Sequence, residues 1–528
     1  MPKLTDSADY AVAQAHFSWD RVWGFFDGDR ASLNIAHECI DRHAIDDARI
    51  AVRIAHADGR DEVLTFREIA DWSSRFAHWL EARGVAAGDR VAVMLDPSLS
   101  FYAAIFGAMK CGAVAVPLFT LFGPDGLSLR VADCAPKLLL LGAEKLSVAE
   151  GLNEVELVVA DQEQLAELRA FPASYQATTR ADDVALFQYT SGTTRELPEA
   201  VKHTHRAIVI LMAAALYGTG IRPDDQFFCP SSPAWGHGLA HGTLAPLALG
   251  VTTGTYAGKF DAVRLIRALQ DYGITNLSAA ATHYRMMRTS GRASDFQFRI
   301  KKLSYTGEPI DGATLHFIDE TFGVPVCSIY GTTEVGVVLV NYPGATDFAV
   351  KPGALGKPVP GVLVEVQRPD GSCCAPGEIG EIKLWRRNAW IPTKDLGRID
   401  EDGYFFHAGR ADDVIISAGW TMSAVEIEDV LLRHPGVHAA AVIGVADEVR
   451  GLVVKAFIVP APDYPTDEAT VGDIQNFVRD RLSQHEYPRR IAFVAELPRT
   501  PAGKVNRKAL RDREAAATTD TSNQRETA

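Results

Sequence analysis

The 528-residue sequence lacks several features that mark common functional classes. No Gly-Lys-Ser or Gly-Lys-Thr step is present, so the phosphate loop of Walker-type NTPases is missing. The longest apolar run, Ala207–Tyr217, is too short to span a bilayer, and the first residues lack the apolar core of a secretion signal. We therefore expect a cytoplasmic protein with no membrane insertion.

Positive charge is also scarce, because 53 Lys and Arg stand against 67 Asp and Glu and give a net charge of −14. This balance argues against a nucleic-acid groove and leaves room only for a local basic pocket around a phosphorylated ligand. Cysteines are few, odd in number and without the spacing of metal sites. They predict reduced thiols. Their positions are 39, 111, 134, 229, 327, 373 and 374.

Helix and strand patterns alternate through most of the chain. Thr65 and Glu68 have capping-box spacing and open a helix that stops at Gly84. Short apolar runs predict strands at 91–95, 113–117, 138–141, 184–187, 226–229, 274–277 and 302–305, and helices at 101–111 and 207–216. This alternation predicts an α/β fold with mainly parallel sheets.

Three further regions differ in pattern. A chain of this length is too long to fold around a single hydrophobic core, so several domains are expected. From Gly353 to about Arg410, short strands and turns predict a β-rich subdomain, and the first sixty residues predict an extension packed on the main domain. Beyond lies a small α+β unit, with helices at 426–433 and 473–482 and strands at 439–443 and 453–458. We therefore expect an N-terminal domain at 1–409, a mobile C-terminal domain at 410–513 and a disordered polar tail at 514–528.

A hydroxyl-rich stretch begins after Tyr189, between an apolar strand and an apolar helix. We predict a strand-to-helix loop that binds phosphate, since backbone N–H groups and hydroxyls at such junctions donate to phosphate oxygens. Composition alone favours a plain Ser/Thr turn, because such clusters are common in loops. The residues are Thr190, Ser191, Gly192, Thr193 and Thr194.

This stretch resembles the signature loop of the adenylate-forming superfamily, which includes acyl-CoA synthetases, adenylation domains and luciferase. Arg195-Glu196 stand where one glycine is usual, and Glu199-Ala200 replace the usual Lys-Gly. Lys202, slightly downstream, is the candidate to replace the missing lysine.

A second resemblance lies at Ile329-Tyr-Gly-Thr-Thr-Glu334. It implies that Tyr330 stacks on adenine, Thr333 contacts the α-phosphate and Glu334 holds Mg²⁺, beside Gly331 and Thr332. Without it, these residues would be read as a helix N-cap. The adjacent turn at Gly307, Glu308 and Pro309 resembles one that lines the nucleotide.

Three C-terminal motifs resemble the same superfamily in family order. Asp395, after Lys394 in place of a usual glycine, would bind the ribose hydroxyls, and Arg410 would touch the ribose. Asp412 would be the hinge, and Gly419 and Trp420 would face the site after rotation. Lys504 would stabilise the carboxylate and α-phosphate during adenylation, its loop made flexible by Gly503.

The segment Trp235–Gly242 contains two histidines one helical turn apart. His237 and His241 could hold zinc, but no third ligand is evident. The resemblance instead makes Trp235, Gly236 and His237 the wall of an acyl pocket. Since Ser231–His241 contains no Asp, Glu, Lys or Arg, the acid should be an apolar monocarboxylate of medium-chain or aromatic type.

The resemblance thus implies an acid–CoA ligase that uses ATP, Mg²⁺ and CoA, closest to the acetyl-CoA and medium-chain acyl-CoA synthetases. A stand-alone adenylation enzyme that loads a carrier protein and a non-catalytic nucleotide-binding relative are the alternatives. We expect small-molecule partners and no nucleic acid. The sequence leaves a homodimer open.

Overall fold

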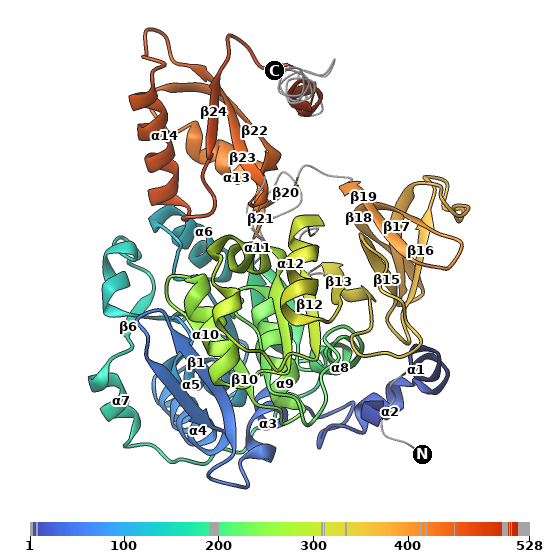
Figure 1. Ribbon diagram of the computed structural model, residues 1–528. Coiled ribbons are helices and arrows are strands. Elements are labelled where there is room, and N and C mark those ends of the chain that lie inside the picture. Colours follow the sequence, from blue (N-terminus) through green and yellow to red (C-terminus); the bar gives the residue numbers. More distant parts are fainter. Residues whose placement is uncertain are drawn as a thin grey trace.

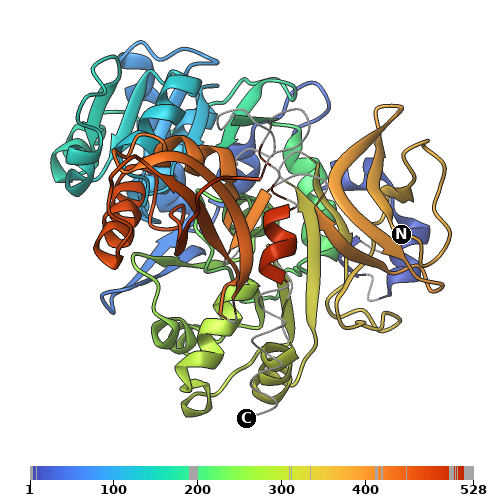
Figure 2. The same ribbon diagram turned by 90° about the horizontal axis from the view of Figure 1, so that it is seen from above.

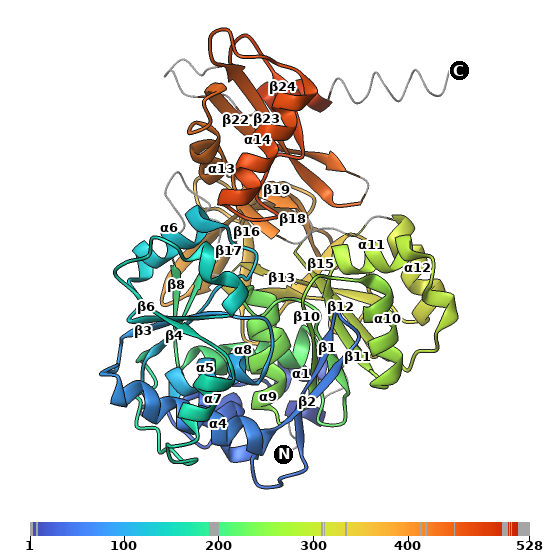
Figure 3. The ribbon, with the colours of Figure 1, turned by 90° about the vertical axis from the view of Figure 1, so that its left-hand side faces the viewer.

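The computed structural model describes residues 4–6, 9–189, 200–307, 310, 312–332, 335–410, 414–417, 420–447, 449–498, 505, 507 and 509–515. A large N-terminal domain carries a small C-terminal domain on one side (Figure 1, Figure 3). The predicted α/β class is confirmed, with mainly parallel sheets in the large domain followed by a β-rich part and a small α+β domain.

The first sheet of the large domain has the strand order β6-β5-β3-β4-β7-β8. All its pairs are parallel except β7 with β8. Its strands are β3 Arg90–Met94, β4 Val114–Pro117, β5 Leu138–Leu141, β6 Glu156–Val159, β7 Val184–Tyr189 and β8 Ala200–Thr204. Its helices are α4 Phe66–Ala82, α5 Leu99–Lys110, α6 Pro124–Cys134 and α7 Gln162–Leu168. The predicted capping box at Thr65 and Glu68 is confirmed, and it opens α4.

The second sheet joins a parallel centre to the antiparallel β-rich part, in the order β16-β17-β18-β19-β15-β14-β13-β12-β11-β9-β10-β1-β2. Its parallel part contains β1 Ile50–His56, β9 Phe227–Phe228, β10 Thr253–Ala257, β11 Asn276–Ala280, β12 Lys302–Thr306 and β13 Val326–Thr332, with β2 Asp61–Thr65 antiparallel at the edge. The remaining strands are β14 Gly336–Val340, β15 Ala354–Pro358, β16 Leu363–Gln367, β17 Gly380–Arg386, β18 Ala389–Ile399 and β19 Phe405–Arg410. The predicted β-rich subdomain is confirmed at the right of Figure 1.

Helices cover these sheets and bury their apolar faces in two cores, one that includes α8, η4 and α9 and one that includes α10, α11 and α12. They are α8 Ala207–Tyr217, the π-helix η4 His237–Leu244, α9 Ala245–Ala248, α10 Ala262–Asp271, α11 Ala281–Ser290 and α12 Gly312–Phe322. Short 3₁₀ turns are η1 Leu4–Asp6, η2 Asp41–His43, η3 Ala143–Val148 and η5 Ala293–Asp295. Among the described residues, no helix combines the length and apolar character needed to cross a membrane.

The N-terminal residues are part extension and part sheet. The helices α1 Tyr10–His16, α2 Trp19–Trp23 and α3 Ile35–Cys39 come first, and the Tyr10 hydroxyl donates to the Pro358 carbonyl at 2.9 Å. In Figure 2 this segment lies beneath the β-rich subdomain. The expectation of a packed extension is wrong for β1, because residues 50–56 form an integral strand between β10 and β2.

The small domain packs two helices on a three-stranded sheet, in the order β22-β23-β24. Its elements are α13 Ala424–Leu431, β22 Val437–Asp447, β23 Gly451–Pro460, α14 Glu468–Arg481 and β24 Arg490–Phe493, preceded by the hairpin β20 Val414–Ser417 and β21 Trp420–Ser423. The predicted helices and strands of this region are confirmed.

One local expectation and one alternative interpretation are wrong. The hydroxyl-rich stretch does not join a strand to a helix, because Ala200–Thr204 forms β8, which pairs antiparallel with β7, and α8 begins only at Ala207. Likewise, Gly331 does not begin a helix N-cap, since it lies in β13 and pairs with Val337 of β14. In both places a hairpin partner, which local patterns do not reveal, determines the structure.

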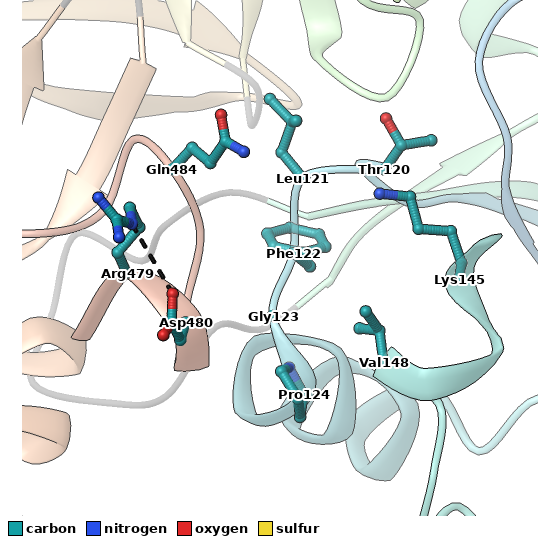
Figure 4. A pocket seen from close by; sticks show the side chains of 10 residues that line it. All are labelled: Thr120, Leu121, Phe122, Gly123, Pro124, Lys145, Val148, Arg479, Asp480 and Gln484. Atoms are coloured by element: carbon teal, nitrogen blue, oxygen red, sulfur yellow. Dashed lines mark ion pairs between the residues drawn. The ribbon is translucent and has the colours of Figure 1, made fainter. Parts of the chain in front are cut away.

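The two domains meet at α6 and the segment after α14. The Gly123 N–H donates to the Leu482 carbonyl at 2.5 Å, and Arg433 donates to Asp125 at 3.1 Å. A cavity of about 240 Å³ lies in this contact. In Figure 4, Phe122, Gly123 and Pro124 stand between Lys145 on one side and the ion pair of Arg479 with Asp480 on the other.

Candidate active site

A cavity of about 550 Å³ opens where β7, β12, β13, α8 and η4 come together. Residues from 35 to 486 line it, so it is assembled from both domains. Eight residues predicted from separate motifs lie on its wall. They are Trp235, Gly236, His237, Gly307, Tyr330, Gly331, Thr332 and Asp395.

One part of the wall carries a carboxylate held by a tyrosine. The Tyr330 hydroxyl donates to Asp395 Oδ2 at 2.6 Å and lies 3.2 Å from Thr393 Oγ1. The other carboxylate oxygen, Oδ1, lies 3.4 Å from His407 Nε2. Asp395 is 3% exposed, so its position is fixed by these neighbours. A carboxylate held in this way can accept hydrogen bonds from a vicinal diol, and its role toward ribose stays a prediction.

The residue before this carboxylate has unusual backbone geometry. The pairing of β18 with β17 shifts between Pro392 and Leu396, and Lys394 in that bulge has a φ of 63°. Glycine adopts this left-handed conformation without a Cβ penalty, whereas other residues rarely do. The backbone therefore retains the geometry of the usual glycine although a lysine occupies the position.

Glycine is required at Gly331 for a different reason. A Cβ there would collide with the backbone carbonyl of Gly336 across the β13–β14 hairpin. The hairpin strands can therefore approach only because position 331 has no side chain, and this approach places Tyr330 and Thr332 on the cavity wall.

The opposite part of the wall is aromatic and aliphatic, and two histidines, His237 and His241, also lie on it. The rings of Trp235 and His237 lie 5.4 Å apart. His237 Nδ1 lies 3.0 Å from Ser231 Oγ, and Nε2 lies 2.8 Å from Ser278 Oγ. Burial lowers the pKa of His237 well below its usual value, so this imidazole is neutral at physiological pH.

The zinc alternative fails at this pair. Both ring nitrogens of His237 already face serine hydroxyls. In the part of the chain that the structure describes, no group of three His, Cys, Asp or Glu side chains is arranged to hold a metal ion. His237 is therefore part of a hydrogen-bonded pocket wall.

The two strands that flank residues 190–199 are joined by Asp133 of α6, which the sequence reading missed. Asp133 Oδ2 accepts from the Tyr189 hydroxyl at 2.7 Å and from the Ala200 N–H at 3.3 Å. Burial raises the pKa of Tyr189, with further contributions from Cys134 and Asp133, so the phenol stays a donor. One carboxylate thus fixes both ends of the predicted phosphate loop.

The same helix carries a second missed residue, Arg130. Its guanidinium is buried, stands over the Phe122 ring at 4.0 Å, and lies 3.9 Å from the Glu486 carboxylate of the small domain. Both charged groups line the cavity. No sequence pattern joins positions 130 and 486, because they meet only through the docking of the two domains.

Lys202 does not reach the cavity wall. It is exposed on β8, where it pairs with Phe187 and its ammonium lies 5.3 Å from the Phe187 ring. Its neighbour His203 lines the cavity, and adjacent residues of a strand point to opposite faces. The structure thus places Lys202 on the face away from the predicted nucleotide site.

Several predicted residues lie outside the described residues, and their roles stay predictions. They are Thr190, Ser191, Gly192, Thr193, Thr194, Glu308, Pro309, Thr333, Glu334, Asp412, Gly419 and Lys504. Arg410 ends β19 and Trp420 begins β21, on either side of the predicted hinge.

Comparison with known proteins decides the family. The AMP-binding enzyme family matches residues 38–389, and the AMP-binding enzyme C-terminal domain matches residues 426–504. Acetyl-coenzyme A synthetase of Bacillus subtilis (strain 168) is 30% identical over 544 residues, covering 95% of this chain and 94% of that protein. The chain belongs to the AMP-binding enzymes.

Solved structures support the same assignment for this AMP-binding enzyme. The crystal structure of Brucella canis acyl-CoA synthetase matches with a TM-score of 0.73 and 30% identity, covering 97% of this chain and 100% of the other. The anthranilate CoA ligase AuaEII in complex with anthranoyl-AMP matches with a TM-score of 0.68 and 26% identity, covering 93% and 99%. The chain is an AMP-forming ligase of the acyl-CoA synthetase type, and ATP and CoA are the substrates that this family implies.

Replacing Asp133 with Ala should weaken the attachment of both strand ends. We expect the free energy of unfolding to fall by about 0.5–1.5 kcal/mol, because the Tyr189 hydroxyl and the Ala200 N–H lose a shared acceptor while the hydroxyl can still donate to the Arg130 carbonyl at 2.9 Å. The KM for ATP of the Ala variant should also rise. Asp133→Asn keeps an acceptor oxygen, so it should recover most of the lost stability and ATP affinity. Denaturant titration and steady-state kinetics measure both effects. Ser128→Ala, an exposed change on the same helix, is the control, and an equal effect from it would contradict the role of Asp133.

Replacing Lys394 with Gly should stabilise the AMP-binding enzyme. The left-handed backbone costs a lysine about 1–2 kcal/mol. Glycine removes this cost, but its greater conformational freedom in the unfolded chain offsets about half of the stability gained. We therefore expect the free energy of unfolding to rise by about 0.5–1 kcal/mol. Lys383→Gly on the adjacent strand, where φ is not positive, should lower it. A loss of stability in Lys394→Gly would show that the lysine side chain outweighs the backbone strain.

Proposed function

We propose that this enzyme activates a monocarboxylic acid with a largely apolar, medium-chain or aromatic body and transfers it to CoA. The acid carboxylate attacks the α-phosphate of ATP, pyrophosphate leaves, and the acyl-adenylate forms. The CoA thiol then attacks the acyl carbonyl and AMP leaves. The observation that carries the proposal is that one cavity is lined by Tyr330, Thr332 and Asp395 on one side and by the largely apolar wall around Trp235 on the other.

The chemistry of that wall supports the acid class. Around Trp235 and His237 the lining is largely aliphatic, with Gln188 and His241 as uncharged polar side chains, and no Asp, Glu, Lys or Arg stands between 231 and 241. A second carboxylate or an α-ammonium group would be desolvated there without a charged partner, which is unfavourable by several kcal/mol. The aliphatic residues are Ile208, Leu211, Ala214, Leu239, Ala240 and Leu244.

We assign further roles to residues on the nucleotide side. Tyr330 packs against adenine and Asp395 receives the ribose hydroxyls, which its contact with the Tyr330 hydroxyl would orient. Glu334, with phosphate oxygens, is the candidate ligand of Mg²⁺, a hard cation that prefers such oxygens and would neutralise phosphate charge. Lys504 is the candidate to stabilise the charge that develops at the carboxylate and the α-phosphate.

Pyrophosphate release, measured with and without CoA across a panel of acids, tests the function. Release that depends on an acid and is followed by thioester formation with free CoA supports the ligase. Adenylation without thioester formation would instead indicate a carrier-protein acceptor. A protein that binds ATP but releases no pyrophosphate with any acid would be a non-catalytic relative. The left-handed backbone kept at Lys394 favours the catalytic reading.

Trp235 should limit the size of the acid. We expect Trp235→Ala to shift kcat/KM toward bulkier acids by about tenfold, since removing a large wall side chain changes discrimination by roughly 1–3 kcal/mol. Competition between hexanoate and dodecanoate, or between benzoate and naphthoate, measures the shift. An unchanged acid profile would contradict the placement of Trp235 in the acyl wall.

Two variants should separate the half-reactions. Adenylation and thioester formation need different groups in one site, so we propose that the small domain turns about Asp412. Lys504→Ala should lose adenylation by about 100-fold or more, yet still convert a supplied acyl-adenylate to thioester. Asp412→Pro, which fixes φ at the hinge, should keep pyrophosphate release and lose thioester formation. Equal impairment of both steps in both variants would exclude the rotation.

A further inference from the structure

Two arginines on the wall of the main cavity differ in their charge environment. Arg130 lies 3.9 Å from the Glu486 carboxylate, which lines the same cavity. Arg386, the last residue of β17, is half-buried, and its Nη2 donates to the Val335 carbonyl at 2.9 Å. Among the residues that the structure describes, no carboxylate forms an ion pair with Arg386. The wall therefore carries a cation whose charge is not neutralised by a described residue.

A tight hairpin fixes the position of Arg386. Arg386 pairs with Ala389 of β18, and the two residues between them, Arg387 and Asn388, have φ of 52° and 59°. A two-residue turn with two positive φ values matches the twist of the flanking strands. Neighbouring side chains of a strand point to opposite faces, so the exposed Trp385 points away from the cavity that Arg386 lines.

The Arg386 guanidinium lies on the side of the cavity proposed for the nucleotide. Val335, whose carbonyl it contacts, also lines the cavity, and the Val335 N–H donates to Thr332 Oγ1 at 3.4 Å. Thr332 and Tyr330 belong to the same strand and lie on the same wall. An anion bound to Arg386 would thus lie beside the groups proposed for the nucleotide.

A half-buried cation without a counter-charge is unfavourable. Burial lowers the pKa of Arg386, and the neighbouring cation Arg387 lowers it further. An arginine nevertheless stays charged in proteins, so the cost of the charge remains. The guanidinium N–H groups form a planar fork that fits two oxygens of one phosphate or carboxylate. These features point to an oxyanion as the partner of Arg386.

The phosphate chain of ATP is the oxyanion that the site favours. The loop motif carries Glu199 where a lysine is usual, and Lys202 lies on the face away from the cavity. We propose that Arg386 binds phosphate oxygens of ATP and supplies the positive charge that neither of these residues provides. The inference rests on the ATP-dependent reaction proposed above and adds a substrate-binding residue to it.

Nucleotide affinity tests the proposal. The dissociation constants of ATP, with Mg²⁺ present, and of adenosine are measured by titration calorimetry on the full chain. We expect Arg386→Gln to bind ATP about tenfold to a hundredfold more weakly, because hydrogen bonds to a charged group are lost. Adenosine has no phosphate, so its affinity should not change. Arg386→Lys keeps the charge without the planar fork and should restore part of the ATP affinity.

Arg387→Gln is the matched control. Arg387 is exposed, is the next residue in the chain and lies outside the cavity lining that the described residues form. Its loss removes the same charge without removing a phosphate contact, and an exposed charge is screened by salt, so ATP affinity should be retained. In steady-state kinetics, Arg386→Gln should raise the KM for ATP with every acid and leave the order of preferred acids unchanged.

The outcomes are distinguishable. Equal ATP affinity of Arg386→Gln and the unaltered chain would overturn the inference and leave the ligase function standing. An equal loss of ATP affinity in Arg387→Gln, or an equal loss of adenosine affinity in Arg386→Gln, would also overturn it, because the effect would not come from a phosphate contact. A loss confined to acids with two carboxylates would assign Arg386 to the acid instead. No binding of ATP by the unaltered chain would overturn the proposed function, and the inference with it.

Discussion

The Asp133 carboxylate is the contact on which the arrangement of the site depends. It accepts from the Tyr189 hydroxyl and the Ala200 N–H, so the last residue of one strand and the first of the next are held to α6. The same helix docks against the small domain through Asp125 and Arg130. The ends of the predicted phosphate loop, part of the cavity wall and the domain contact are thus all attached to α6. A helix is stiff, so it keeps the relative positions of these three parts fixed.

Much of the fold could be predicted because its signals are local. Apolar runs such as Leu138–Leu141 become buried strands, and the capping box at Thr65 begins a helix where the pattern places it. The strand Ala200–Thr204 could not be predicted in this way. It is short, contains Lys202 and His203, and is a strand because it pairs with β7. Propensity does not report such pairing.

The residues of the candidate site also fall into two groups: those that local motifs reveal and those that only the folded chain brings together. Tyr330, Asp395 and Trp235 could be named from motifs that resemble a known family, and one cavity brings them together. Asp133, Arg130 and Glu486 could not, since each acts through a neighbour distant in sequence. Lys202, the candidate to replace the lysine missing from the loop motif, stands on β8 on the face away from the cavity. A motif therefore identifies residue types, but the direction of a side chain on a strand depends on pairing.

The Arg130–Glu486 pair has a consequence for the field inside the cavity. The guanidinium belongs to the large domain and the carboxylate to the small one, and their opposite charges cancel only while the domains stay docked. The electrostatic potential at this wall is thus a function of domain position as well as of composition. Undocking would leave the Arg130 cation without this carboxylate beside the chamber in which a polyphosphate is expected, and the potential there would become more positive without any change in protonation.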